Sequence, residues 1–118
     1  MNEIETEFVP YNVAVELKEL GFDEPCFGYF DMEDENVLKC DVVYENENLS
    51  APTYRQAFKF FRDKYKLSSW IYNSDLDKYF FTVLQNGRII KANQSTSSYE
   101  LAELECLNKL IEICKNEQ

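Results

Sequence analysis

Apolar and polar side chains alternate along two runs, Lys78–Gln85 and Arg88–Asn93, which are rich in aromatic and β-branched residues. Between the runs stands Asn86-Gly87, a pair that readily adopts the positive φ angles of a type I′ turn. The pattern therefore predicts a β-hairpin. A two-residue turn also fixes the register of the two strands, which predicts three opposed pairs: Leu84 with Ile89, Val83 with Ile90, and Phe81 with Ala92.

The two faces of this hairpin differ in character, because successive side chains of a strand point to opposite sides. One face is almost wholly apolar and consists of Tyr79, Phe81, Val83, Ile90 and Ala92. The other face is mixed and consists of Phe80, Thr82, Leu84, Ile89 and Lys91. We expect the apolar face to be covered by a helix.

A helix is predicted after the hairpin. Ser97 and Glu100 have the spacing of an S-x-x-E capping box. Apolar residues then recur at three- and four-residue steps, as in a helix that faces a core: Leu101, Leu104, Leu107, Ile111 and Cys114.

The first part of the chain predicts a helix and a second hairpin. Residues 11–20 have apolar positions at helical spacing and end at Gly21, a typical C-terminal stop. Residues 26–31 and 37–44 are predicted strands, joined by an acidic turn at 32–36.

The middle of the chain predicts a second long helix and a further strand. After Ala51-Pro52, Thr53 and Gln56 form another capping box, and residues 69–73 are the predicted strand. The element order becomes α-β-β-α-β-β-β-α, which indicates a single α+β domain with helices packed on an antiparallel sheet. We expect an acidic tail at 1–7, a helix and acidic hairpin at 8–49, and an αβββα unit at 50–118.

Charge is distributed unevenly along the 118 residues, whose net charge is −10. Residues 1–49 carry 14 acidic and 2 basic side chains, whereas residues 50–118 carry 8 acidic and 10 basic ones. An acidic half of this kind either keeps a protein soluble or imitates a nucleic-acid backbone. No apolar run approaches the length of a membrane helix, and the acidic N-terminus is unlike a signal peptide. We therefore expect a cytoplasmic protein.

Candidate catalytic groups are scarce. The chain has no histidine, and it lacks the glycine-rich phosphate-binding motifs. Four cysteines without metal-site spacing are expected to be reduced core thiols: Cys26, Cys40, Cys106 and Cys114. We predict a protein that is not an enzyme and that holds no cofactor and no metal.

Residues 51–115 have the order helix, three strands, helix, and the closing segment reads SSYELAELECLNKL. This region resembles a double-stranded-RNA-binding domain, which holds phosphates with lysines at the start of its closing helix. Here that position reads Ser97, Ser98, Tyr99 and Glu100. The resemblance implies the topology, and we expect no binding to nucleic acid.

Three further blocks carry a second resemblance: GFDEPCFGY, APTYRQAFKFFRDKY and YELAELECLNKLIEI. They are similar to small uncharacterised proteins of bacteriophages and mobile elements, especially from gut Bacteroidetes. The chain from residue 51 onward also resembles the phage α-β-α sandwich domain. The resemblance implies an accessory protein that acts in a bacterial cytoplasm.

The sequence thus favours a small non-enzymatic protein that binds a host or phage protein, or a second copy of itself. Monomers seldom expose large apolar patches, so the mixed hairpin face needs a cover. The first helix and hairpin provide it in one alternative, and a partner provides it in the other. The candidate partner-binding residues are Trp70, Tyr72, Phe80, Leu84 and Ile89, together with the acidic residues Asp31, Glu33, Asp34 and Glu35. The alternatives are a nucleic-acid-binding module and an acidic nucleic-acid mimic.

Overall fold

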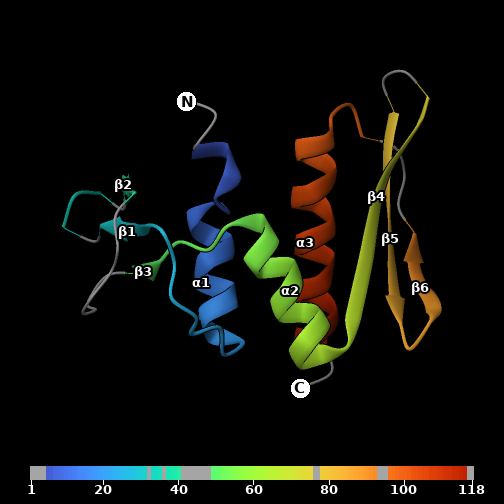
Figure 1. Ribbon diagram of the computed structural model, residues 1–118, viewed down its shortest axis with the longest axis horizontal. Coiled ribbons are helices and arrows are strands. Elements are labelled where there is room, and N and C mark those ends of the chain that lie inside the picture. Colours follow the sequence, from blue (N-terminus) through green and yellow to red (C-terminus); the bar gives the residue numbers. More distant parts are fainter. Residues whose placement is uncertain are drawn as a thin grey trace. The chain divides into compact units, whose positions relative to one another are not determined.

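The computed structural model describes residues 5–31, 33–35, 37–40, 49–75, 78–92 and 96–116 (Figure 1). The chain divides into two compact units, Met1–Ala57 and Phe58–Gln118. Three α-helices and two small antiparallel sheets make up the described part. The predicted α+β class is confirmed, and the element order follows the prediction apart from a short 3₁₀ helix, η1 (Glu5–Glu7), and one additional short strand.

The first unit contains helix α1 (Tyr11–Glu19), which ends in a Schellman motif. Gly21 has φ 103°, its N–H donates to the Lys18 carbonyl at 3.0 Å, and the Phe22 N–H donates to the Leu17 carbonyl at 2.9 Å. Gly21 is therefore the predicted helix stop. Leu17 and Phe22 are both buried, as expected for the apolar contact that accompanies this motif.

The first sheet has the order β2-β1-β3. It consists of β1 (Tyr29–Asp31), β2 (Val37–Lys39) and β3 (Leu49–Ser50). The predicted hairpin is present, but β1 is shorter than the predicted 26–31, and residues 41–44 of the predicted second strand lie outside the described residues. Strand β3 has no counterpart among the predicted elements. The Phe30 ring of β1 makes an edge contact with Tyr11 of α1, with ring centroids 5.4 Å apart.

Helix α2 (Tyr54–Tyr65) begins at the predicted capping box. The Gln56 N–H donates to Thr53 Oγ1 at 3.2 Å, and the Thr53 N–H donates to Gln56 Oε1 at 3.1 Å. The Gln56 side chain also donates to the Pro25 carbonyl at 2.9 Å. The start of α2 is thereby fixed to the loop before β1.

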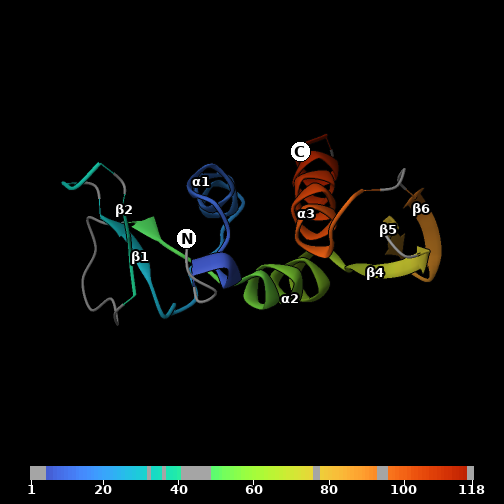
Figure 2. The same cartoon turned by 90° about the horizontal axis from the view of Figure 1, so that it is seen from above.

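The second unit contains an antiparallel sheet of order β4-β5-β6. Its strands are β4 (Leu67–Asp75), β5 (Lys78–Gln85) and β6 (Arg88–Ala92). Asn86 has φ 54° and Gly87 has φ 80°, which confirms the predicted type I′ turn. Helix α3 (Tyr99–Asn116) packs on one face of this sheet, over β4 and β5 (Figure 2).

The register of the second hairpin differs from the prediction. Leu84 pairs with Ile89 as predicted, but a β-bulge follows, so Val83 pairs with Lys91 and Thr82 with Ala92. The predicted pairs of Val83 with Ile90 and of Phe81 with Ala92 are wrong. Ile90 is the extra residue of the bulge and is 41% exposed, so it does not join the covered face.

The start of α3 also differs from the prediction. Ser98, rather than Ser97, supplies the cap: its Oγ accepts a hydrogen bond from the Leu101 N–H at 3.1 Å. The apolar stripe differs as well, since Leu101 is 40% exposed and Leu104 is half-buried. The buried side of α3 is formed by Ala102, Cys106, Leu107, Leu110, Ile111 and Cys114. Within the described ranges, no helix is both long enough and apolar enough to cross a membrane.

Candidate functional site

The β4-β5-β6 sheet presents two faces of different exposure. The side that α3 covers holds Phe81 and Val83, which are 1% and 0% exposed. Two contacts join this side to α3: a side-chain hydrogen bond between Ser69 and Cys106, and an edge contact of Tyr79 with Tyr99 at 6.2 Å between ring centroids. We call this side the covered face.

The opposite side of the sheet, which we call the open face, follows from the register. Ser68 pairs with Leu84, Trp70 with Thr82, and Tyr72 with Phe80, while Leu84 also pairs with Ile89. Because side chains alternate along each strand, the open face includes Ser68, Trp70, Tyr72, Phe80, Thr82, Leu84 and Ile89. All five apolar and aromatic residues predicted to bind a partner thus lie together on one surface.

Exposure is greatest at the two edge strands of the open face. Trp70 is 63% exposed, Tyr72 is 45% exposed and Ile89 is 66% exposed, whereas Phe80 and Leu84 on the central strand are half-buried. The Tyr72 and Phe80 rings are stacked, with centroids 5.5 Å apart and planes 18° apart. Stacking restricts the orientations of these two rings. A binding partner would therefore meet aromatic side chains that are already ordered.

Sequence reasoning did not include Thr82 or Ile90 among the candidate residues. Thr82 lies at the centre of the open face and is only 6% exposed, and its place opposite the large Trp70 explains why. Ile90 reaches the surface because of the bulge. A bulge has no clear sequence signal here, since the flanking pattern alternates as in a regular strand.

The four acidic candidates lie in or beside the turn between β1 and β2, and they interact with their own hairpin. The Glu33 N–H donates to Asp31 Oδ1 at 3.0 Å, and Lys39 Nζ donates to Asp34 Oδ2 at 2.9 Å. Asp34 raises the pKa of Lys39 through that hydrogen bond. Glu35 holds the tight bend with φ 51°. In the residues that the structure describes, no cluster of three or more acidic or cysteine side chains could hold a metal ion.

Basic side chains on and directly after α2 also interact locally. Lys59 Nζ lies 3.0 Å from Asp63 Oδ2, and this hydrogen bond lowers the pKa of Asp63. Lys66 donates to the Asp63 carbonyl at 3.0 Å, and Lys64 lies 5.6 Å from the centre of the Phe60 ring. Exposed local pairs of this kind are typical of a solvated helix surface.

Cys26, Cys106 and Cys114 are buried and Cys40 is exposed, and all four are free thiols. Burial raises the pKa of Cys26 to about 11, with a smaller effect of Glu24, and burial also raises the pKa of Cys106 to about 11. A thiol with such a pKa is protonated at neutral pH and is a poor nucleophile.

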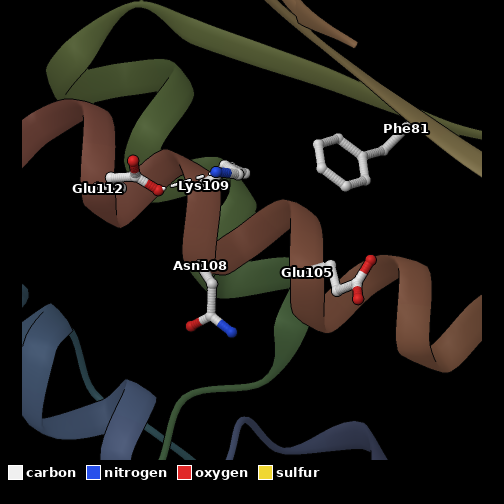
Figure 3. A pocket seen from close by; sticks show the side chains of 5 residues that line it. All are labelled: Phe81, Glu105, Asn108, Lys109 and Glu112. Carbon is white, nitrogen blue, oxygen red and sulfur yellow. Dashed lines mark hydrogen bonds and ion pairs between the residues drawn. The ribbon is translucent and has the colours of Figure 1, made fainter. Parts of the chain in front are cut away.

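A pocket of about 370 Å³ lies beside α3 and is lined by Phe81, Glu105, Asn108, Lys109 and Glu112 (Figure 3). Lys109 Nζ and Glu112 Oε2 form an ion pair at 3.1 Å. Figure 3 shows that Asn108 points away from the side on which Phe81 lies. The polar groups therefore do not converge on one point, as those of a ligand site do.

No family model matches the chain, and neither a curated protein nor a solved structure matches it.

Proposed function

We propose that this chain is a small non-enzymatic protein that binds another protein through the open face of the β4-β5-β6 sheet. The observation that carries the proposal is the gathering of Trp70, Tyr72 and Ile89, each at least 45% exposed, on one side of one sheet. Tryptophan and tyrosine are enriched among the residues that dominate binding energies.

The exposed area at this face is large enough to contribute substantially to a binding free energy. An aromatic side chain buries roughly 150–250 Å², and 63% of Trp70 is exposed. Trp70 alone therefore has on the order of 100 Å² left to bury, which corresponds to about 2–3 kcal/mol at the usual transfer coefficient. Tyr72 and Ile89 add smaller areas of the same kind.

The partner is expected to be a protein with an apolar surface. The centre of the open face, formed by Trp70, Thr82 and Leu84, has no charged residue, and at one end of the sheet Lys78 pairs with Asp75. A complementary partner would therefore offer an apolar centre surrounded by a polar rim. The resemblance of residues 21–29, 51–65 and 99–113 to phage and mobile-element proteins supports a partner in the bacterial cytoplasm, such as a host or defence protein that is inhibited by the binding.

The test compares protein captured by the wild type with protein captured by a Trp70→Ala, Tyr72→Ala double variant. We expect the double variant to lose a specific partner. Phe27→Ala is the matched control, because Phe27 is an exposed aromatic residue (71%) that belongs to the first unit and not to this sheet. It should leave the captured set unchanged.

Direct binding to the purified partner then tests whether the open face is the contact surface. Trp70 is the only tryptophan in the chain, so its fluorescence emission reports whether this side chain is buried on binding. A blue shift at saturating partner supports the proposal. An unchanged emission, or identical capture by the double variant and the wild type, would contradict it. Binding of a single-stranded oligonucleotide in place of a protein would favour the nucleic-acid alternative, since bases stack on exposed aromatic residues.

A further inference from the structure

The two edges of the β4-β5-β6 sheet are built differently. Strand β5 is central, and β4 and β6 each have one side without a strand neighbour among the described residues. An unpaired strand edge presents backbone N–H and C=O groups that can pair with another strand. Native proteins usually protect such edges with charges, prolines, bulges or short strands.

Strand β6 has three of these protections. It is five residues long, it contains a bulge at Ile90, and its sequence RIIKA includes two basic residues. Pairing of a further strand with β6 is therefore disfavoured.

Strand β4 lacks these protections along most of its length. It has nine residues, and its sequence LSSWIYNSD contains no lysine, arginine or proline. The register with β5 is regular from Leu67 to Asn73, and the irregularity falls between Asn73 and Asp75. From Leu67 to Asn73 this edge is regular and carries no charged residue, and an edge of this kind can accept another strand.

The sequence of β4 is also close to symmetric about Ile71. When two antiparallel copies are aligned on this residue, Trp70 lies opposite Tyr72 of the second copy, and Ser69 lies opposite Asn73 of the second copy. Each pair occurs twice, as a two-fold axis requires. Aromatic pairs and polar hydrogen-bonding pairs across strands are both stabilising. We propose that two copies of this chain pair antiparallel through the β4 edge, centred on Ile71, to form a continuous six-stranded sheet.

This pairing joins the two open faces into one. Trp70 of each copy meets Tyr72 of the other beside the stacked Tyr72 and Phe80 rings. The aromatic row then runs across both copies. Such a surface presents two equivalent binding regions to a partner.

The dimer is expected to be weak, because one strand pair and two aromatic pairs bury less than the roughly 1,200–2,000 Å² of a stable interface. We expect half-dissociation at about 10 µM, within the range of small transient interfaces. Analytical ultracentrifugation of the wild type from about 1 to 200 µM measures the dissociation constant of the dimer. A monomer throughout that range would overturn the proposal, whatever the variants do.

Two charged variants locate the interface. Tyr72→Lys places an ammonium on the β4 edge strand and should weaken self-association at least ten-fold. Ile89→Lys places the same charge on the same open face but on β6, and Ile89 is 66% exposed, so self-association should be unchanged. Equal weakening by both variants would indicate face-to-face packing of two open faces and would overturn the edge-paired dimer.

Cross-linking tests the register. Ile71→Cys, in a Cys40→Ser background, brings two thiols opposite each other at the two-fold axis, within the 4.4–6.8 Å between Cα atoms that a disulfide spans. Ser68→Cys in the same background is the control, because the two Ser68 positions would lie about six residues apart along the strands, or roughly 20 Å. Cross-linking at 71 and not at 68 supports the register. Equal cross-linking at both positions would overturn it.

The dimer and the proposed docking function can fail separately. A monomeric wild type whose Trp70→Ala, Tyr72→Ala variant loses a partner would overturn the dimer and leave the docking function intact. A wild-type dimer with the predicted cross-link, together with unchanged partner capture by that variant, would support the dimer and overturn the docking function.

Discussion

The covered and open faces of the β4-β5-β6 sheet are made by the same three strands, yet their side chains differ in exposure to solvent. On the covered face, Phe81 and Val83 are almost fully buried under α3. On the open face, Trp70 and Ile89 remain more than 60% exposed. Apolar character alone therefore does not decide which side of a sheet forms the core, because both faces are rich in large apolar residues.

The central strand makes the comparison sharper. Three consecutive residues of β5, Phe81, Thr82 and Val83, are buried, although alternate residues point to opposite faces. Thr82 is on the open face and is screened by its neighbour Trp70. The exposure of the open face is thus concentrated at the edge strands β4 and β6, where a partner can reach large side chains.

Among truncations, the largest effect is expected from Phe81→Ala on the covered face. The Phe81 side chain is 1% exposed, and truncating a buried phenylalanine costs about 3–5 kcal/mol, because apolar contacts are lost and a cavity remains. Urea unfolding measures the change. Phe80→Ala, on the neighbouring half-buried position, is the matched control and should cost clearly less. Equal losses would contradict the difference between the faces.

High pH provides a second test of the covered face. Cys106 lies on the buried side of α3 and hydrogen-bonds Ser69 of β4, and its burial raises its pKa from 9.0 to about 11. Above pH 9 the unfolded chain loses this thiol proton while the folded chain keeps it, so the free energy of unfolding falls as the pH rises from 9 to 11. The full shift corresponds to no more than about 2–3 kcal/mol, and relaxation of the site makes the effect smaller.

The contribution of Cys106 is isolated by comparing the wild type with Cys106→Ala at pH 8.5 and pH 10.5. The variant lacks the titrating thiol, so its stability should fall less over this interval. Cys26, whose pKa is also raised to about 11, and Tyr99, whose pKa burial raises, remain in both proteins. Parallel pH profiles would show that Cys106 is not held in its neutral form by the fold.

Gly87→Val tests the hairpin that creates both faces. Gly87 has φ 80°, and a Cβ atom there would meet nothing within 4 Å, so only the backbone conformation opposes a side chain. A β-branched residue at positive φ should cost about 1–2 kcal/mol. Asn86→Gly is the control and should be nearly neutral, because glycine also adopts the φ of 54° at that position. A loss of similar size in the control would indicate that the positive φ at residue 87 is not the cause of the destabilisation.

The sequence predicted those elements that local chemistry determines. The Asn86-Gly87 turn, the Thr53–Gln56 capping box and the Gly21 helix stop each depend on residues close together in the chain, and each is confirmed. The five apolar candidates of the open face could be grouped because strand alternation is regular. Local chemistry therefore set most of the boundaries and the composition of the site.

The wrong predictions concern features for which the local sequence allows two similar alternatives. Ser97 and Ser98 can both cap a helix, and the structure has Ser98 in that role. The bulge at Ile90 shifts the register by one residue, and the alternation of apolar and polar residues in β6 gives no signal for it. The division into two sheets likewise depends on which strands meet in space, as β3 and β1 do.

The smallest effect on stability is expected from Leu84→Asp, and it separates the two faces most directly. Leu84 is half-buried on the open face, whereas its neighbour Val83 is 0% exposed on the covered face. Val83→Asp buries an unpaired carboxylate and should unfold the protein. Leu84→Asp should lower the free energy of unfolding by no more than about 1 kcal/mol, as is usual for surface positions, and should abolish partner capture. Circular dichroism melts and pull-down assays on the two variants measure both properties. An unfolded Leu84→Asp protein would mean that another part of the chain covers this face, and a folded one that still captures every wild-type partner would mean that the face is not the binding surface.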